Sequence, residues 1–307
     1  MAVTGTGIVS DPYVVHSYNE IKEVFTNRTT YPITDNMLYI KLDNDIDCKT
    51  YGYVWTWSTI VFATSTTSDR FTFDLNNHTI KNFRVTQSNY VFDGANTDYW
   101  DNNRIQNGII KNIYLQQASG FSNRGIKYEN VGVSIFATNM TGNQMFQNGT
   151  KFKRCGLNII WNAKNEYGKR LSYWGSRGGS ATQGIFEYCN IHLNITEPCE
   201  GLWGCDYEDY PLKDCKITGS IIKSDGDEWI LTRGGLRNCI IDLEISRKDG
   251  VSSSYTLSHY SNYSISNKDK LGTGISSSTT TGATSEQIVN GDWLRGQGFP
   301  VVNVSSP

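Results

Sequence analysis

The chain has 307 residues and a nearly balanced formal charge of −2, and 19% of its residues are charged. No basic face that would bind nucleic acid is therefore expected, and the apolar runs are too short to insert into a membrane. Aromatic residues are frequent (8 Trp, 18 Tyr and 12 Phe), and Asn, Ser, Thr and Gly dominate the polar residues. Because aromatic and β-branched residues favour strands while Gly and Asn favour turns, this composition predicts an all-β protein.

Residues 1–38 are predicted to form an N-terminal cap. The opening "MAVTGTGIVSDPY" has no basic region followed by an apolar one, so no secretory signal is expected. The segment "HSYNEIKEVF" has the pattern of a capping box, with Ser17 three residues before Glu20. Ile21, Val24 and Phe25 follow at helical spacing, which predicts a short amphipathic helix that could cover the open end of a repetitive fold.

Residues 39–249 contain a repeated strand pattern. Four segments have a Cys three residues after a large apolar residue, followed by apolar residues at every second position: "FKRCGLNII", "FEYCNIHLNI", "LKDCKITGSI" and "LRNCIIDLEI". The pattern extends upstream without Cys through "IKNFRV", "IKNIYL" and "YENVGVSI". Aligned in this way, the anchor positions are Phe83, Ile113, Val131, Cys155, Cys189, Cys215 and Cys239.

The intervals between these anchors are 30, 18, 24, 34, 26 and 24 residues. A period-2 apolar strand recurring at uneven intervals is typical of a parallel β-solenoid, in which each coil adds a strand and insertions leave as loops. Leucine-rich repeats, the competing solenoid, are disfavoured because their Leu spacing is absent. The predicted fold class is therefore a single-stranded parallel β-helix with a short capping helix before it and a flexible arm after it.

The seven anchors are expected to form an inward-facing core ladder. Free Cys packs as a small buried hydrophobe, and the anchor cysteines lack a second Cys or His at the close spacing of a metal site. The odd total of seven Cys without an export signal favours reduced thiols. Cys199 and Cys205 share one loop, where a disulfide or a metal pair is the alternative. We expect no metal and no cofactor.

Residues 250–286 are Ser/Thr-rich with few apolar residues, which is typical of a linker or an extended arm. Residues 287–307 regain apolar residues. This last segment is predicted to close the final coil or to dock on a neighbouring subunit.

Several of these segments resemble right-handed parallel β-helix proteins. "DPYVVHSYNEIKEVF", "YIKLDNDIDC" and "FDLNNHTIKNFRV" are similar to the openings of such proteins, and "QIVNGDWLRGQGFPVVN" resembles their closing segment. These openings occur in bacterial surface proteins and in virion proteins of bacteriophages, particularly fibres, spikes and appendages. The resemblance implies a right-handed helix. The missing export signal and the missing Gly-rich repeats of surface adhesins favour the phage group.

Three insertions follow the repeated strand in consecutive coils, at residues 161–179, 199–210 and 224–235. Because they leave the coil at a similar phase, they are expected to form one surface rich in aromatic and acidic residues. Aromatic faces stack on sugar rings, so this surface is a candidate glycan- or receptor-binding site. Its candidate residues are Trp161, Tyr173, Trp174, Trp203, Asp206, Tyr207, Glu208, Asp209, Trp229 and Arg233. The alternative is that the aromatics pack the loops onto the rod and the acids are solvated.

We therefore expect a non-enzymatic structural protein of a bacteriophage virion, assembled in the host cytoplasm, that attaches to host-surface polysaccharide or another receptor as a fibre, spike or decoration subunit. The expected partners are other capsid or tail proteins, and the resemblance implies a homotrimer. One alternative is a polysaccharide depolymerase, a lyase or glycosidase using carboxylates among Asp206, Glu208 and Asp209. Another is a bacterial cell-surface adhesin. No catalytic residue is assigned, because the four His residues all fit cap, turn, strand or linker positions.

Overall fold

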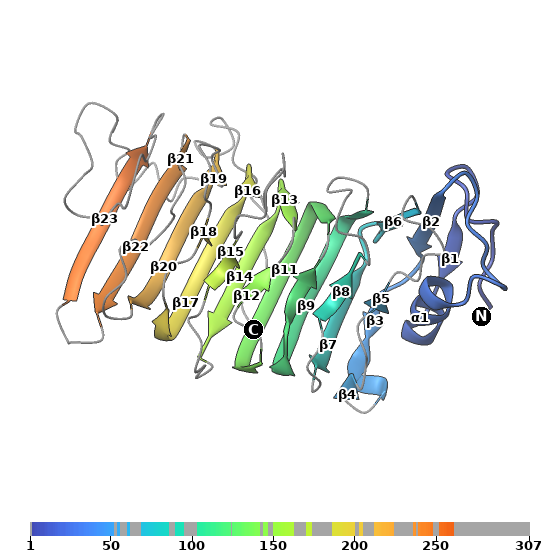
Figure 1. Ribbon diagram of the computed structural model, residues 1–307, viewed down its shortest axis with the longest axis horizontal. Coiled ribbons are helices and arrows are strands. Elements are labelled where there is room, and N and C mark those ends of the chain that lie inside the picture. Colours follow the sequence, from blue (N-terminus) through green and yellow to red (C-terminus); the bar gives the residue numbers. More distant parts are fainter. Residues whose placement is uncertain are drawn as a thin grey trace.

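The structure is a computed structural model, and its described residues are 2–51, 54–55, 60–61, 69–85, 90–94, 103–123, 125–141, 144–146, 150–162, 170–173, 186–199, 203–204, 212–223, 236–237, 239–247 and 252–260. The chain forms a parallel β-solenoid with one short α-helix at its N-terminal end (Figure 1), which confirms the predicted fold class.

The coils build three faces, which we call faces 1, 2 and 3. Face 1 consists of β2 (Met37–Leu42), β6 (Arg70–Asp74), β13 (Lys151–Lys153), β16 (Phe186–Glu187), β19 (Leu212–Lys213), β21 (Leu236–Arg237) and the first halves of β9 (Asn103–Ala118) and β11 (Ile126–Met140). Face 2 consists of β3 (Ile46–Asp47), β4 (Val54–Trp55), β7 (Thr79–Val85), β14 (Gly156–Trp161), β17 (Asn190–Cys199), β20 (Lys216–Lys223), β22 (Cys239–Arg247) and the second halves of β9 and β11. A short 3-10 helix, η1 (Cys48–Tyr51), lies between β3 and β4.

Face 3 is a separate sheet of shorter strands. It consists of β5 (Ile60–Val61), β8 (Tyr90–Asp93), β10 (Gly120–Asn123), β12 (Gln144–Phe146), β15 (Arg170–Tyr173) and β18 (Trp203–Gly204). Faces 1 and 2 belong to one continuous sheet, because β9 and β11 run through the corner between them. Alternate side chains of faces 1 and 2 point into a hydrophobic core, to which face 3 contributes residues such as Phe92, Phe121 and Phe146.

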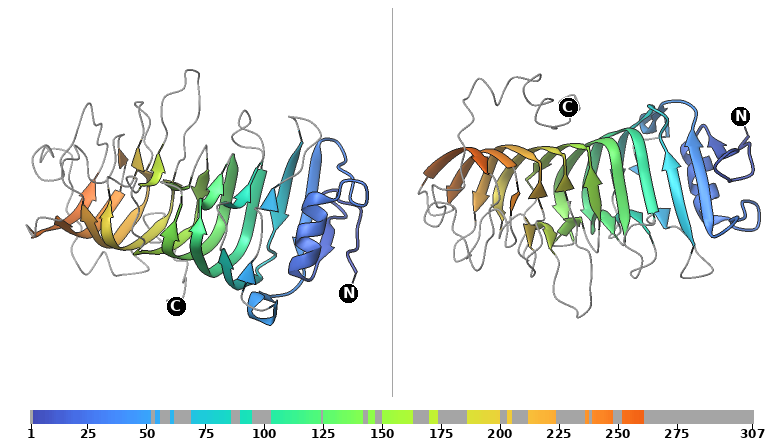
Figure 2. Two further views of the ribbon diagram at one scale, coloured as in Figure 1. Left: turned by 60° about the horizontal axis from the view of Figure 1, so that its bottom comes forward. Right: turned by 90° about the horizontal axis from the view of Figure 1, so that it is seen from above.

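The N-terminal end of the core is covered by α1 (Tyr18–Thr26), as the two views of Figure 2 show. The N-cap bond of the predicted capping box is present, because Ser17 Oγ accepts a hydrogen bond from the Glu20 N–H (3.3 Å). The reciprocal bond differs, because Glu20 Oε2 accepts from the His16 N–H (2.7 Å) instead of the Ser17 N–H. Phe25 on the buried side of the helix packs edge-to-face on Phe71 and Phe73 of β6, at centroid distances of 4.9 and 5.9 Å.

The strand ladder begins inside the predicted cap. β1 (Tyr13–Val15) pairs in parallel with β2, and Tyr13 lies opposite Ile40. On the other side of β1, Thr4 and Val14 form an antiparallel bridge in which the Val14 N–H donates to the Thr4 carbonyl (2.9 Å). The N-terminal segment therefore continues the solenoid by one strand instead of only covering it.

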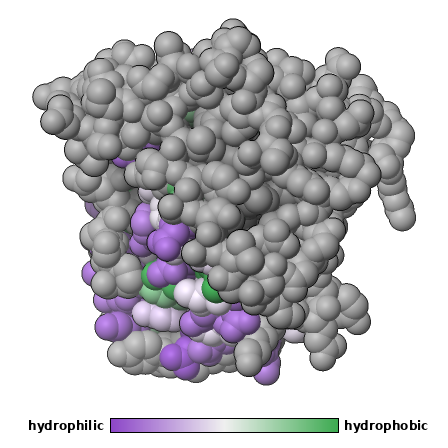
Figure 3. Space-filling model, turned by 90° about the vertical axis from the view of Figure 1, so that its left-hand side faces the viewer, coloured by the Kyte–Doolittle hydropathy of each residue, from purple (hydrophilic) through white to green (hydrophobic). Residues whose placement is uncertain are grey.

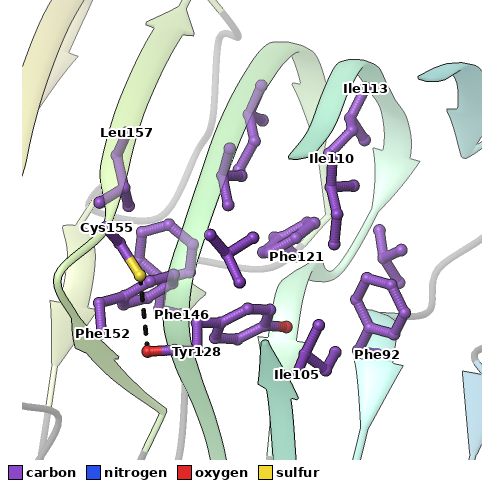
Figure 4. Packing of buried hydrophobic residues seen from close by; sticks show 14 of the residues in the cluster. Phe92, Ile105, Ile110, Ile113, Phe121, Tyr128, Phe146, Phe152, Cys155 and Leu157 are labelled. Carbon is purple, nitrogen blue, oxygen red and sulfur yellow. Dashed lines mark hydrogen bonds between the residues drawn. The ribbon is translucent and has the colours of Figure 1, made fainter. Parts of the chain in front are cut away.

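A column of cysteines lies in the core at the corner between faces 1 and 2. Cys155, Cys189, Cys215 and Cys239 are free thiols and 0% exposed. The Cys155 thiol donates to the carbonyl oxygens of Tyr128 in the preceding coil (3.5 Å, dashed in Figure 4) and of Lys153 (3.3 Å), and Cys189 and Cys215 repeat both contacts. Burial raises the pKa of the Cys189 thiol well above its ordinary value. All four thiols are fully buried and therefore pack the core as structural cysteines.

The predicted seven-residue ladder is buried throughout, but it forms two columns instead of one. Phe83 stacks on Ile113, and Ile113 stacks on Ile135. Val131, which heads the cysteine column, stacks on Gly108. The alignment that placed Val131 above Ile113 is therefore wrong, although each of the seven residues lies in the core.

The physical reason for this error is a bulge. Asn82 and Asn112 have left-handed φ angles of 60° and 54°, and the Asn112 side chain donates to that of Asn82 (2.9 Å). Lys111 and Asn112 of β9 together lie opposite the single residue Ser134 of β11. The bulge is therefore present in β9 but absent from β11 in the next coil. In the sequence, Asn82 before Phe83 and Asn112 before Ile113 resemble the corner residue that precedes each Cys. In the structure, these two Asn residues mark a bulge within the strand instead of the corner.

The corner between faces 1 and 2 is formed by another column of residues with left-handed φ angles, separate from Asn82 and Asn112 at the bulge. Its members have φ angles of 53–55° and precede the cysteine column or its continuation: Asn107, Asn130, Arg154, Tyr188 and Asp214. Asn adopts this conformation readily, whereas Arg and Tyr do so rarely. The corner conformation is therefore imposed by the stacking of coils as much as by local preference.

The C-terminal end of the described ladder is closed by β23 (Ser252–Tyr260), which pairs antiparallel with β22. These residues fall in the stretch predicted to be a linker. Ser and Thr are compatible with a strand. Pairing with the open edge of β22 stabilises β23 although β23 contains few apolar residues. The rest of 250–286 and the closing segment 287–307 lie outside the described residues. Viewed from this end (Figure 3), the described residues at the surface are mainly hydrophilic, with a few hydrophobic ones among them.

Replacing Cys215 by Asp tests the inward column. The substitution places a carboxylate among buried side chains, and we expect it to lower the free energy of unfolding by about 3–5 kcal/mol. Urea unfolding followed by circular dichroism measures the change. Thr218→Asp, at an outward position of β20, which begins just after Cys215, is the control and should change stability by less than about 1 kcal/mol. A Cys215→Asp protein that unfolds like the parent would show that the column does not face the core.

Replacing Phe25 by Ala tests the contact between α1 and the first coils. Loss of the ring that packs on Phe71 and Phe73 should destabilise the protein by about 3–5 kcal/mol. The effect should appear in thermal unfolding and as faster amide exchange in β6. Glu23→Ala, an exposed position on the same helix, should leave both measurements unchanged. Equal effects of the two substitutions would contradict the role assigned to Phe25.

Candidate functional site

Part of the predicted aromatic loop surface falls on described backbone. Tyr173 ends β15 and Trp203 begins β18, and these strands pair in parallel, with Ser172 opposite Trp203 and Tyr173 opposite Gly204. The backbones of these two insertions therefore lie side by side on face 3. The remaining candidates lie outside the described residues: Trp174, Asp206, Tyr207, Glu208, Asp209, Trp229 and Arg233.

Trp161 is a core residue, so its prediction as a glycan-binding loop residue is wrong. It is the last residue of β14, it is 0% exposed, and it lies between Ala137 and Ile195 in the ladder. It continues the inward alternation of Leu157 and Ile159. The insertion therefore begins after Trp161, one residue later than the sequence suggested.

The outer surface of face 2 carries an aromatic patch, which we define as Tyr114, Phe136, Ile160 and Asn194. These residues are register partners on four consecutive strands and are partly exposed, while their strand neighbours are buried. The rings of Tyr114 and Phe136 are stacked, with centroids 5.1 Å apart and an interplanar angle of 17°. Two rings and an aliphatic side chain thus form a strip along the rod, with an amide at its end.

A row of small polar residues lies beside the aromatic patch. It consists of Ser134, Asn158, His192 and Thr218, which are also register partners. His192 is exposed, and its Nδ1 lies 3.0 Å from Thr218 Oγ1. Ser134 Oγ and Asn158 Oδ1 are buried and have no hydrogen-bond partner in the described part of the chain.

These two oxygens are on the outward side of face 2 but are covered, because Ser134 is 0% and Asn158 is 8% exposed. Leaving a buried polar atom without a partner costs about 1–3 kcal/mol. Such atoms are rare in folded proteins, and each of them calls for a partner such as a water, a ligand or another chain segment. Stacked rings beside hydroxyl and amide groups offer both apolar and hydrogen-bonding contacts. This combination suits a ligand that presents apolar faces and hydroxyl groups together, as sugars do.

Sequence reasoning missed this patch because of the misaligned anchor. When Ile113 is aligned with Val131, Tyr114 falls opposite Gly132 and Phe136 is displaced from its row. In the observed register, Ile113 lies opposite Ile135, and Tyr114 lies opposite Phe136. The signal was present as large apolar residues at outward positions of successive strands, but it became visible only in the correct register.

The outer surface of face 1 carries a second feature, a cationic strip that we define as Arg104, Lys127, Lys151, Lys153 and Lys213. Two carboxylates, Glu129 and Glu187, lie between these cations. Glu129 pairs with Lys127 (3.3 Å) and Arg104 (3.7 Å), and Glu187 pairs with Lys213 (2.5 Å) and Lys153 (3.8 Å). Each carboxylate therefore has two cationic partners.

The pKa of Glu187 reflects these contacts. Partial burial raises the pKa of this carboxyl, but the hydrogen bond from Lys213 and the charges of Lys213, Lys153 and Lys127 outweigh that effect and hold the pKa below its ordinary value. Conversely, the hydrogen bond to Glu187 raises the pKa of Lys213. Both groups are thus favoured in their charged forms.

Two further observations concern the described part of the chain. Its His, Cys, Asp and Glu residues do not form a group of three or more that could hold a metal ion. None of its helices has the length and apolar character needed to cross a membrane.

The fold defines the chain as a parallel β-solenoid. No protein-family model matches its sequence, and no curated protein matches it. Among solved structures, the crystal structure of a putative immunoglobulin A1 protease from Bacteroides ovatus aligns with a TM-score of 0.47 and 12% sequence identity. The alignment covers 85% of this chain and 83% of that chain.

Replacing Glu187 by Gln tests the ion pairs of the cationic strip. Because the folded-state pKa is lowered, the stability contributed by ionised Glu187 is complete above its ordinary value of 4.5 and is lost as the pH falls through the folded-state pKa. The variant should lack this part of the acid-induced loss, so its melting temperature should fall less than that of the parent between about pH 6 and about pH 3. Glu244→Gln, at an exposed position, is the control. Parallel curves for parent and Glu187→Gln would contradict the prediction.

Proposed function

We propose that the protein is a non-enzymatic attachment protein, a rigid rod of a bacteriophage particle that binds host-surface glycans through outward-facing side chains. The observation that supports glycan binding best is the partly exposed stack of Tyr114 and Phe136 beside the polar row of face 2. The assignment to a phage particle rests on the resemblance of the N-terminal and C-terminal segments to virion β-helix proteins.

The aromatic patch provides the contacts that sugar recognition requires. Aromatic rings contribute a large apolar contact area with a defined orientation. A small number of polar groups around such a surface then fixes the orientation of the ligand. Asn194 and His192, which are partly exposed and exposed, supply an amide and an imidazole group on β17 beside the strip. The patch therefore combines a partly exposed apolar strip, in which the two stacked rings each cover a face of the other, with donors and acceptors at its margin.

The solenoid also favours binding by keeping the patch rigid. The four residues of the aromatic patch lie on β9, β11, β14 and β17, which are joined by continuous parallel pairing. A surface that is already ordered loses little conformational entropy when a ligand binds. The free energy gained by contact with the rings is therefore not offset by the cost of ordering a loop.

Replacing Phe136 by Ala tests the patch. The substitution removes one of the two stacked rings, and we expect glycan affinity to fall at least about tenfold, since central aromatic contacts commonly contribute more than 1 kcal/mol. A glycan array identifies the ligand, and titration calorimetry with that ligand measures the affinity. Tyr39→Ala, a partly exposed aromatic on β2 of face 1, is the matched control and should bind like the parent.

Three outcomes would overturn this proposal or part of it. If the parent binds no glycan on the array, the attachment function is wrong. If the parent binds and Phe136→Ala binds equally well, the aromatic patch is not the site. Release of shortened products from the bound glycan would replace the proposal with a depolymerase. Immunogold labelling of phage particles tests the assignment to a virion.

A further inference from the structure

We infer that the cationic strip of face 1 is a second binding surface, whose ligand is an acidic polysaccharide lying along the rod. The inference extends the proposed attachment function to a different face and a different class of glycan. It does not depend on the aromatic patch, because it rests on the charges and register of face 1.

The strip is positively charged in a chain whose net charge is −2. Arg104, Lys127 and Lys151 form one row, while Glu129, Lys153, Glu187 and Lys213 continue the neighbouring row from Gln106. Between β9 and β19, the described outward positions of face 1 thus hold five cations, two carboxylates and one amide. Toward the N-terminus the second row reaches Asp74, so the cationic region ends at β9.

The carboxylates of the strip are less exposed to solvent than most of its cations. The side chains of Glu129 and Glu187 are 18% and 24% exposed, whereas Arg104 is 41% and Lys153 and Lys213 are each 32% exposed. Lys127, at 20%, is close to its partner Glu129. An approaching ligand therefore meets cationic groups first, although the carboxylates take part in every pair.

The spacing of the charges favours an acidic polysaccharide over nucleic acid. Successive coils are separated by about 4.8 Å, so each row offers about one side chain per 4.8 Å. Duplex DNA carries one negative charge per roughly 1.7 Å of its axis, which is far denser than this strip. Polysaccharides with one carboxylate per sugar or per disaccharide have a sparser charge. Glu129 and Glu187 repel phosphates and the carboxylates of a polysaccharide alike. A polymer with sparse charge can place hydroxyl groups beside them, however, and both side chains accept hydrogen bonds from hydroxyls.

The shape of the strip supports the same choice. Binding of single-stranded nucleic acid relies on aromatic side chains that stack on bases, and the described outward positions of face 1 from β9 to β19 hold none. One aromatic, Tyr188, lies beside the strip at the corner, with its ring centroid 5.8 Å from Lys213 Nζ. The strip is also only two residues wide, so it matches a linear polymer along the rod better than a broad anionic membrane. The corner adds one cation and one carboxylate, Arg154 and Asp214, which nearly balance.

The test compares two double variants by calorimetry at about 50 mM and about 300 mM NaCl. Lys127→Gln/Lys153→Gln removes two charges from the strip, and Lys81→Gln/Lys111→Gln removes two from paired outward positions of face 2. The probes are polygalacturonate, neutral dextran, duplex DNA and anionic phospholipid vesicles. We expect the parent to bind polygalacturonate, with weaker binding at the higher salt concentration. At low salt the strip variant should lose affinity about 25-fold, or about fivefold per lysine, and the control less than about twofold.

Several results would overturn the inference. These are no binding of polygalacturonate by the parent, equal losses in the two double variants, or tighter binding of DNA or vesicles than of polygalacturonate. Circular dichroism of each variant checks that the fold is retained. Phe136→Ala should still bind polygalacturonate, so a failure of the aromatic patch and a failure of the cationic strip are distinguished by separate variants and separate probes.

Discussion

The structure depends on one constraint, that each coil must place its side chains directly over those of the preceding coil. Inside the rod this produces columns of like residues, such as the stacked rings of Tyr128, Phe152 and Phe186, whose centroids lie 4.7 and 5.0 Å apart. The cysteine column follows the same rule beside the corner. Because the register is fixed by the inside, outward residues are aligned as well. The aromatic patch and the cationic strip are therefore both consequences of core packing, although each is assembled from segments far apart in the sequence.

The sequence was sufficient to predict the solenoid, the inward cysteines and the capping helix. Each of these depends on a short local pattern, either alternation of apolar residues or a capping box. It was not sufficient to separate the bulge at Asn112 from the corner at Asn130, because Asn is favoured in the same left-handed conformation at both places. Only strand pairing distinguishes them, and pairing is a property of the stacked coils. The same limit hid the aromatic patch, whereas Trp161 was placed in a loop because the end of its strand was set one residue too early.

The two proposed surfaces lie on different faces of one rigid body. Faces 1 and 2 meet at the corner, so a glycan on the aromatic patch would not compete directly with a polymer along the cationic strip. The corner is constructed from residues as different as Asn130, Arg154 and Tyr188, all with similar φ angles. Core stacking thus tolerates variation at the corner and on the outer faces, while the inward columns hold mainly apolar residues and Cys, with a few buried polar residues such as Asn103 and Ser122. Binding specificity can change on such a scaffold without a change of fold.

Both ends of the described ladder finish with a strand or bridge that runs against the others. Thr4 meets Val14 in an antiparallel bridge, and β23 runs antiparallel to β22. A second rod that approached an end could not continue the parallel pattern, because the polarity of the exposed edge is reversed there. Head-to-tail polymerisation into filaments, the characteristic hazard of a fold with open strand edges, is thereby disfavoured at both ends. Self-association, where it occurs, is directed to the long sides of the rod, which are the surfaces that its outward-facing side chains can tune.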